Sequence, residues 1–232
     1  MNSAQPDRKK ILENHPFFAK LSASERDTLL SRARGKRFRA GEIIFHKGVP
    51  GDSMLAVLSG QVRISAPGID GREIVLNTIE AGQIFGEIAL VDGGPRTAEA
   101  AAATDCELVF LDRRDFLPFL ENHPSLAHAL LLIVCQRLRQ TTEQVEDVMF
   151  LQLPERLARK LLQLAASHGR QMQEGIRIES GLSQRELGNL LGLSRESINK
   201  QLSSWHRQGI LNTEGSVITV INLEELRRIA DG

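Results

Sequence analysis

The side chains best suited to binding chemistry lie together in one short stretch, Gly82–Ala98. Its first part, Phe85–Glu87, leads into the apolar run Ile88–Val91, which is long enough for about one helical turn. The free N–H groups at the start of such a turn can bind an anion. After a glycine-rich turn, Arg96 and Thr97 supply a cation and a hydroxyl that could reach the same anion.

Glu87 does not suit a site for an anion alone, because a carboxylate repels a phosphate. Acidic residues accept hydrogen bonds from ribose hydroxyls in dinucleotide sites, and Glu87 could hold a sugar in the same way. The stretch therefore suits a ribose phosphate that carries one negative charge. The alternative is a tight turn in which Glu87 simply pairs with Arg96, since ion pairs of this kind are common.

The composition is that of an ordinary soluble globular protein. The chain has 232 residues, 41% of them hydrophobic and 25% charged, which allows one large or two small domains. No apolar run approaches the ~20 residues that a membrane span requires, so we expect no membrane partner, and the polar N-terminus does not indicate a signal peptide. Cys106 and Cys135 are too few for a disulfide framework or a four-thiolate metal site, which favours a cytoplasmic protein. The formal net charge is zero, so charge alone does not indicate nucleic acid.

The first half of the chain has the pattern of a strand-rich domain behind a helical N-terminal segment. Apolar residues recur at helical spacing from Asp7 to Arg34, and Ser22 with Glu25 forms a capping box for a second helix. From Phe38 the period changes to that of strands, and glycines separate the short runs, which is typical of a barrel or a rolled sandwich. The expected strands are Ile43–Phe45, Met54–Leu58, Val62–Ile64, Glu73–Leu76 and Glu107–Leu111.

A long helix is expected after a short one over Asp115–Glu121, with Ser125 as its N-cap and its end near Leu151. Its apolar residues recur at alternating spacings of 3 and 4, which is the pattern of a coiled-coil seam and favours a parallel dimer. The alternative is a helix packed on its own domain. The seam positions are Leu131, Val134, Leu138, Thr141, Val145 and Val148.

One seam position is polar, because Thr141 occupies it and Thr142 stands beside it. A hydroxyl in a seam costs stability unless something bonds to it. Either a ligand contacts these hydroxyls, or both bond back to carbonyl groups of their own helix.

The C-terminal part has the pattern of a winged helix-turn-helix. Pro154 suits the first turn of a new helix. Further on, Ser183 and Glu186 form a capping box, Gly192 ends that helix, and Ser194 caps the next one at once. Two strand-like runs near the C-terminus would form a hairpin wing.

The exposed side of the second helix carries side chains that can bind base edges in the major groove. Arginine and lysine can donate to guanine, glutamate can accept from cytosine, and asparagine suits adenine. The start of a recognition helix is where such contacts are made, whereas a solvated charged face is the alternative for any one of them. The candidate DNA-contacting residues are Gln184, Ser194, Arg195, Glu196, Ser197, Asn199 and Lys200.

The stretch Gly82–Ala98 resembles the phosphate-binding cassette of cyclic-nucleotide-binding domains, in which Phe-Gly-Glu and an apolar run precede Arg-Ser/Thr-Ala. The resemblance extends over a β-roll from about Phe17 to Leu120. It implies that Glu87 binds the ribose 2′-hydroxyl and that Arg96 pairs with the cyclic phosphate. The implied ligand-binding residues are Phe85, Gly86, Glu87, Ile88, Arg96, Thr97, Ala98, Thr141 and Thr142.

The second half resembles the winged helix of the CRP/FNR regulators, the cyclic AMP receptor protein family, in Ser194–Glu196 and the basic Lys200. The resemblance implies that these residues bind a TGTGA-type half-site, with the base at Lys200 left open because lysine lacks the bidentate geometry of arginine. It also implies that Thr141 and Thr142 contact a purine base, one from each subunit of a homodimer. A double-stranded DNA operator and RNA polymerase are the other implied partners.

These patterns predict an α+β fold with a cyclic-nucleotide-binding β-roll over residues 1–124, a dimerisation helix over 125–151 and a winged helix-turn-helix over 152–232. The expected function is transcription regulation in which a ligand rotates a hinge near Leu153. The ligand candidates are 3′,5′-cyclic AMP and 3′,5′-cyclic GMP, because Thr97 resembles a residue of guanine-selective domains and the threonine pair resembles an adenine contact.

Two alternatives are the same DNA-binding fold with a cyclic dinucleotide or nothing in its roll, and an enzyme or sink for cyclic nucleotides. The sequence holds no phosphate loop, no nucleophile elbow and no zinc-ligand spacing. The sequence therefore offers no residues for an enzymatic reaction, and we expect no metal site.

Overall fold

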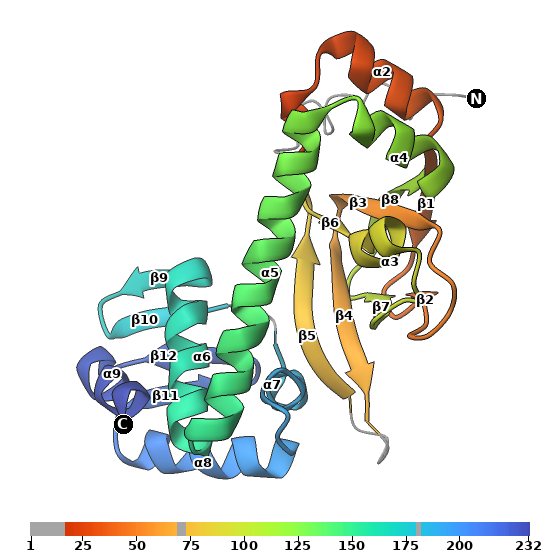
Figure 1. Ribbon diagram of the computed structural model, residues 1–232. Helices are drawn as coiled ribbons and strands as arrows, with labels where there is room; N and C mark the ends of the chain where they lie inside the picture. Colours follow the sequence, from red (N-terminus) through yellow and green to blue (C-terminus); the bar gives the residue numbers. More distant parts are fainter. Residues whose placement is uncertain (1–16, 69–72, 180–181) are drawn as a thin grey trace. The chain divides into compact units, whose positions relative to one another are not determined.

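The computed structural model describes residues 17–68, 73–179 and 182–232, and Figure 1 shows their helices and strands. The chain divides into two compact units. The first ends on the long helix α5 (Pro124–Phe150) at Leu138, and the second begins on the same helix at Arg139. The fold is α+β, as the sequence predicts, with a strand-rich first unit and a mainly helical second unit.

The first unit is built on two four-stranded sheets, with the strand orders β1-β8-β3-β6 and β2-β7-β4-β5. Alternate residues of β3 belong to two core clusters. Leu55 and Val57 pack inside the roll, while Met54 and Ala56 pack towards α4 and α5. The strands are β1 (Arg34–Phe38), β2 (Ile43–Phe45), β3 (Ser53–Ser59), β4 (Gln61–Pro67), β5 (Glu73–Glu80), β6 (Ile84–Phe85), β7 (Glu99–Ala102) and β8 (Cys106–Asp112).

All five strands expected from the sequence are confirmed, as β2, β3, β4, β5 and β8. Sequence reasoning missed β1, β6 and β7 for physical reasons. Phe38 is the buried residue of β1, whose other four residues are exposed, so no apolar alternation marks it. β7 contains three alanines, which have little preference for strands, and β6 has two residues.

Helices cover the side of the roll formed by β3 and β8. They are the 3-10 helix η1 (Phe18–Lys20), α2 (Ala23–Ser31), α4 (Arg113–Glu121) and the first part of α5. The capping box expected at the start of α2 is confirmed. The N–H of Ser22 donates to the carboxylate of Glu25 at 2.7 Å, and the N–H of Glu25 donates to the hydroxyl of Ser22 at 3.4 Å.

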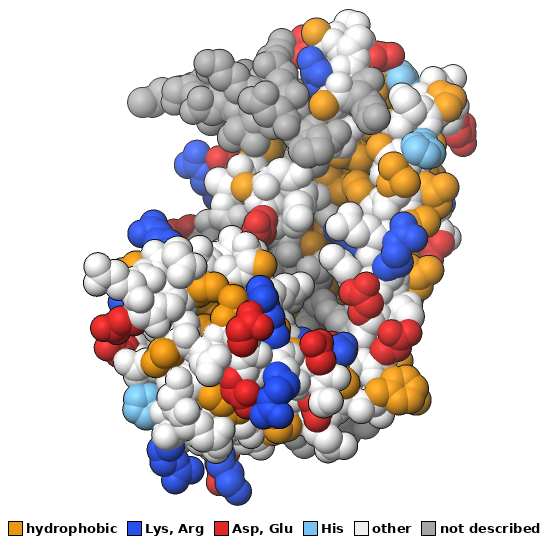
Figure 2. Space-filling view, turned by 90° about the vertical axis from the view of Figure 1, so that its left-hand side faces the viewer, with side chains coloured by type: hydrophobic (Ala, Val, Ile, Leu, Met, Phe, Trp, Pro, Cys, Tyr) orange, Lys and Arg blue, Asp and Glu red, His pale blue; other side chains and the backbone are white. Residues whose placement is uncertain are grey.

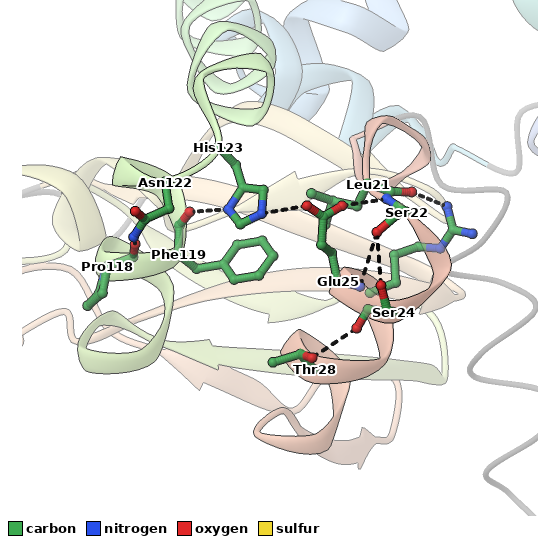
Figure 3. A network of polar contacts seen from close by, with 10 residues as sticks. Leu21, Ser22, Ser24, Glu25, Thr28, Pro118, Phe119, Asn122 and His123 are labelled. Atoms are coloured by element: carbon green, nitrogen blue, oxygen red, sulfur yellow. Dashed lines mark hydrogen bonds and ion pairs between the residues drawn. The ribbon is translucent and has the colours of Figure 1, made fainter.

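His123, between α4 and α5, joins three helices of the first unit (Figure 3). Its Nε2 lies 2.8 Å from the carboxylate of Glu25 in α2, and its Nδ1 lies 2.5 Å from the carbonyl oxygen of Phe119 in α4. The ring of Phe119 also stacks on the imidazole, with the ring centres 3.9 Å apart. This contact fastens the N-terminal helix to the point where α5 begins.

The expectation that Ser125 is the N-cap of α5 is wrong. The helix begins at Pro124, and the carbonyl of His123 accepts the N–H groups of Leu126 and Ala127 at 2.9 and 3.1 Å. Proline suits the first helical position, because its φ is already fixed and the N–H that it lacks would have no partner there. Ser125 therefore lies within the first turn instead of before it.

The second unit packs helices around a small sheet with the order β11-β12-β10-β9. Its core includes Ile198, Leu202 and Trp205, which face inward as expected, together with Leu157 and Leu161. Among the described residues, no helix combines the length and the hydrophobicity that a membrane crossing needs. The remaining elements are α6 (Leu153–His168), β9 (Gly169–Met172), β10 (Gly175–Ile178), α7 (Gln184–Leu191), α8 (Arg195–Arg207), β11 (Leu211–Glu214), β12 (Val217–Val220) and α9 (Leu223–Asp231).

Candidate functional site

The candidate anion site is built where β6 meets the short helix α3 (Glu87–Asp92). Gly86 joins the two and has a φ of 76°, in the left-handed region. A Cβ atom at this position would lie 2.5 Å from Nη1 of Arg96. Glycine is therefore needed here both for its backbone angle and for the close approach of the arginine.

Arg96 is a buried cation that is held by neutral groups. It is 5% exposed, its Nη1 donates to the carbonyl of Gly86 at 2.9 Å, and its Nη2 donates to the hydroxyl of Ser53 at 3.1 Å. Its Cζ also lies 4.3 Å from the centre of the Phe45 ring. Burial lowers the pKa of Arg96, while nearby carboxylates act in the opposite direction. Because arginine stays charged in proteins, this guanidinium can attract an anion to the site.

The loop before β3 holds Arg96 through the backbone. The N–H of Gly48 donates to the carbonyl of Arg96, and the N–H of Arg96 donates to the carbonyl of Val49, both at 2.8 Å. A Cβ atom on Gly51 would lie 2.3 Å from Cβ of Ala89, so only glycine lets the loop pack against α3. The place of Arg96 is therefore set by main-chain contacts as well as by its side chain.

Glu87 is 1% exposed and pairs with Arg137 of α5, whose Nη1 lies 2.5 Å from Oε1 of Glu87. Arg137 also donates to the carbonyl of Ile84. The contact between the two side chains is an ion pair, because neither carboxylate oxygen of Glu87 receives a well-directed hydrogen bond from the described part of the protein. The alternative interpretation, a pair between Glu87 and Arg96, is therefore not what the structure contains. A buried carboxylate with unfilled acceptor positions suits a ligand that donates hydrogen bonds.

Sequence reasoning missed Arg137, although a signal was present. Arg137 lies four residues before Thr141, so both positions share one face of α5. A basic residue one turn from a polar seam position, on the helix expected to contact the ligand, is a candidate partner for Glu87. Its pairing joins positions far apart in the sequence, which no local pattern shows.

The other candidate ligand residues of the first unit differ in exposure. Phe85 and Ala98 are 1% and 6% exposed, and the Phe85 ring lies 5.9 Å from that of Phe45. Ile88 is 42% exposed, and Thr97 is exposed as well. Phe85 and Ala98 therefore help to form the packed wall of the cassette, while Ile88 and Thr97 face outward.

Arg113 at the start of α4 holds the far end of α3. Its Nη1 lies 3.4 Å from the carbonyl of Ala89, and its N–H donates to the carbonyl of Asp52 at 2.7 Å. A Cβ atom on Gly93, which ends α3, would lie 2.8 Å from the same guanidinium. A cation at the C-terminal end of a helix complements the helix dipole, so Arg113 supports α3 from behind the candidate site.

The seam on α5 is exposed in the single chain. Leu131, Leu138 and Val145 are 58%, 66% and 51% exposed. Hydrophobic side chains reach the surface repeatedly on the face that Figure 2 shows. Thr141 and Thr142 are exposed as well and belong to the second unit, and their contact with a ligand stays a prediction. A row of exposed apolar side chains is unusual on a monomer and indicates a surface that another molecule covers.

The helix-turn-helix has the caps that its sequence predicts. The N–H of Ser183 donates to the carboxylate of Glu186 at 2.7 Å, and the N–H of Glu186 donates to the hydroxyl of Ser183 at 3.2 Å. Gly192 ends α7 with a φ of 64°, and the hydroxyl of Ser194 accepts an N–H of the first turn of α8 at 3.1 Å. Local signals therefore fix both helices and the turn between them.

The start of α8 presents the candidate base-contacting side chains to solvent. Four of them, on one side of the helix, are exposed, while the opposite side lies in the core. An exposed helix face with both donors and acceptors can enter a major groove. The exposed residues are Arg195, Glu196, Asn199 and Lys200.

Three other candidate DNA contacts are partly engaged within the protein. The hydroxyls of Ser194 and Ser197 lie 2.8 Å apart, and Ser194 also caps α8. Gln184 is the first residue of α7 and is partly buried. Each of these side chains would contact DNA only with its remaining hydrogen-bonding capacity.

Comparisons with known proteins now identify the family. A family model of the cyclic nucleotide-binding domain matches residues 35–123, and one of the Crp-like helix-turn-helix domain matches residues 155–229. The chain is 33% identical, over 95% of its length and 99% of the relative, to a CRP-like cAMP-activated global transcriptional regulator of Mycobacterium tuberculosis. This chain belongs to the CRP/FNR family of transcription regulators.

Other members of the CRP/FNR family resemble it over most of their length. The cyclic AMP receptor protein of Thermus thermophilus is 30% identical over 95% of this chain and 99% of the relative. The solved structure of a CRP-family regulator from Thermus thermophilus has a TM-score of 0.70 and 27% identity, covering 85% of this chain and 97% of that one. The c-di-GMP-responsive regulator CLP of Xanthomonas campestris has a TM-score of 0.77 and 25% identity, with coverages of 86% and 99%.

Membership assigns a general task to each unit. The first contains a cyclic nucleotide-binding domain, and the second contains a Crp-like helix-turn-helix that binds DNA. The chain is thus a cyclic-nucleotide-binding transcription regulator of the CRP/FNR family, a family of regulators and not of enzymes.

Proposed function

We propose that this regulator is a homodimer that binds a purine 3′,5′-cyclic mononucleotide in its first unit and a palindromic operator through α8. Cyclic AMP is the first candidate ligand and cyclic GMP the second. One observation carries the proposal: the buried cation of Arg96, held by neutral groups, lies near a buried Glu87 whose oxygens receive no hydrogen bond from the described residues. A ligand with one negative charge and a free ribose hydroxyl satisfies both groups at once.

Each group has a defined task in this proposal. The guanidinium of Arg96 donates to the exocyclic oxygens of the cyclic phosphate, with help from Thr97 and the N–H groups at the start of α3. Glu87 accepts the hydrogen bond of the ribose 2′-hydroxyl. Arg137 neutralises Glu87, which lowers the repulsion between that carboxylate and the phosphate. The purine base would reach the threonine pair, Thr141 and Thr142.

The exposed seam of α5 supports the dimer. Apolar residues at alternating spacings of 3 and 4 are those of a two-stranded coiled coil, and their exposure in one chain leaves them for a second copy. A base held by threonines of both copies would link the ligand to the angle between the two helices. Cyclic nucleotide binding then shifts the population of dimer arrangements, with a hinge near Leu153.

The operator is bound by two copies of α8 in successive major grooves. Their separation must match one turn of DNA, about 34 Å, so a palindrome is expected. Arg195 and Lys200 can donate to guanine, and Glu196 can accept from cytosine, which suits a TGTGA-type half-site. Because relatives are described as global transcriptional regulators, RNA polymerase is a further inferred partner.

The test is operator binding by the full-length protein at a fixed salt concentration, followed by fluorescence anisotropy. A palindromic TGTGA-type duplex and a scrambled duplex of the same composition are titrated without nucleotide, with cyclic AMP and with cyclic GMP. We expect cyclic AMP to tighten binding to the palindrome by roughly fivefold or more, and the scrambled duplex to respond little. Equal operator affinity in all three conditions, with unchanged melting curves, contradicts the proposal.

A second candidate keeps the DNA-binding task and changes the effector. The likeness to the c-di-GMP-responsive regulator CLP favours a cyclic dinucleotide in this role. Calorimetric titration with cyclic di-GMP, cyclic AMP and cyclic GMP separates the two candidates. Heat of binding with cyclic di-GMP alone would support the second candidate and remove the first.

A further inference from the structure

Three helices of the second unit meet at the side chain of Arg159 on α6. Its Nη1 donates to Oδ1 of Asp147 on α5 at 2.9 Å. Its Nε donates to the carbonyl of Ala230, in the last turn of α9, at 3.0 Å. The two charged side chains are 47% and 33% exposed, so they lie at the surface and not in the core.

These contacts surround the connection between α5 and α6. Only Leu151 and Gln152 separate the two helices, and the N–H of Leu151 still donates to the carbonyl of Asp147 at 3.1 Å. Asp147 therefore holds this connection through its backbone and, through its side chain, holds α6. The ion pair between Asp147 and Arg159 thus spans the segment that joins α5 to α6 of the DNA-binding domain.

The ion pair is not needed to keep α6 in its place. Leu157, Ala158 and Leu161 of α6 are fully buried in the core of the second unit. Exposed ion pairs contribute little to stability, whereas buried apolar side chains contribute much more. A role in fixing the angle between α5 and α6 explains the position of Arg159 better than a role in holding the fold.

We propose that Asp147, Arg159 and the carbonyl of Ala230 form a clasp that carries rotation of α5 into the DNA-binding domain. With the clasp closed, the last turn of α5 moves together with α6 and α9. Without it, residues 151 and 152 absorb part of the rotation. The inference deepens the proposed function and rests on it, because the rotation is the one that the bound nucleotide would produce.

The clasp makes a prediction about coupling between ligand and DNA. In the full-length protein, the ratio of operator affinities with and without cyclic AMP should fall by roughly fivefold in Asp147→Ala and in Arg159→Ala. The double variant should lose no more than Arg159→Ala alone, because Asp147→Ala breaks a contact that Arg159→Ala has already removed. Arg159→Lys keeps a cation that can pair with Asp147 but lacks the fixed second donor to Ala230, so it should retain only part of the ratio. The affinity for cyclic AMP without DNA should change little.

Arg156 provides a matched control on the same helix. It donates to the carbonyl of Leu191 at the end of α7 and makes no hydrogen bond or ion pair with α5 in the described part of the chain. Arg156→Ala should therefore weaken operator binding by a similar factor with and without cyclic AMP, and leave the ratio unchanged. An equal fall of the ratio in this control would overturn the clasp, since any loosening of the domain would then have the same effect.

A second measurement separates failure of the clasp from failure of the proposed function. Amide hydrogen exchange of residues 148–153 in the nucleotide-free protein should become several-fold faster in both single clasp variants and stay unchanged in Arg156→Ala. A wild-type protein that responds to neither cyclic AMP nor cyclic GMP refutes the proposed function, and the exchange rates then decide whether the clasp exists. Unchanged exchange, or an unchanged affinity ratio in a responsive protein, refutes the clasp.

Discussion

The two candidate sites place their charged side chains in opposite surroundings. In the first unit Glu87 and Arg96 are 1% and 5% exposed. Arg96 donates to the carbonyl of Gly86 and lies over the ring of Phe45, and Glu87 pairs with Arg137. In the second unit the charged residues at the start of α8 are exposed. The charged groups of the first site are buried and held in place, while those of the second lie on an open face.

The difference follows from the size of what each site binds. A small ligand must be held by a few groups, and burial strengthens each contact because the dielectric constant is low. DNA offers a long surface, so affinity is spread over many exposed contacts and specificity over a few base edges. A substitution in the first site should therefore change the affinity for the ligand itself. The effect of a substitution in the second site on DNA affinity should depend on the DNA sequence.

The largest effect is expected from Arg96→Leu. Each hydrogen bond to a charged group contributes about 1.5–3 kcal/mol, so loss of two bonds to the phosphate should weaken cyclic AMP binding by more than about 100-fold. Isothermal calorimetry measures the affinity, and sedimentation checks that the variant keeps the oligomeric state of the wild type. Arg195→Leu is the control and should bind cyclic AMP normally. Unchanged nucleotide affinity in Arg96→Leu removes this arginine from the site.

Glu196→Ala should act next most strongly, and only on some DNA sequences. Loss of one base contact costs about 1–3 kcal/mol at one half-site position. Anisotropy with a set of duplexes substituted at each position shows whether the loss is confined to one base pair. Lys200→Ala serves as the comparison, because a changed preference there should fall at a different position. Equal weakening on every duplex would mean that Glu196 supports the fold or contacts the backbone.

Much of this contrast could be derived from the sequence. The helix-turn-helix could be predicted from Ser183 with Glu186 and from Gly192, because a helix cap depends on residues within about one turn of each other. The cassette was found for a related reason, since glycine, carboxylate and arginine lie within one short stretch. The sequence did not predict the roles of two arginines whose partners are remote in the chain. Arg137 pairs with Glu87 on α3, and the partners of Arg159 lie on two other helices. No local pattern encodes such contacts.

Glu87→Gln should weaken ligand binding in the first site by less than Arg96→Leu does. The amide keeps the shape of the side chain but removes the charge that faces Arg137, and accepts more weakly from the ribose hydroxyl. We expect cyclic AMP binding to weaken by about tenfold, or about 1.4 kcal/mol. The decisive ligand is 2′-deoxy cyclic AMP. Wild-type protein should bind it less tightly than cyclic AMP, and the variant should show a smaller difference between the two ligands. Equal binding of both ligands by the wild type would assign Glu87 to another task.

The smallest effect concerns pH and a carboxylate outside both sites. The pKa of Glu25 lies below its ordinary value, because Ser22 bonds the carboxylate through its hydroxyl and its backbone N–H, and because His123 lies beside it. A group whose pKa is depressed by folding stabilises the fold above its unfolded pKa, about 4.3, and this contribution is lost as the pH falls through the folded value. Glu25→Gln should therefore lower the melting temperature slightly at pH 7, and by less as the pH falls towards 3. A Glu25→Gln difference that is constant from pH 3 to pH 7 would show that the carboxylate acts by shape and not by charge.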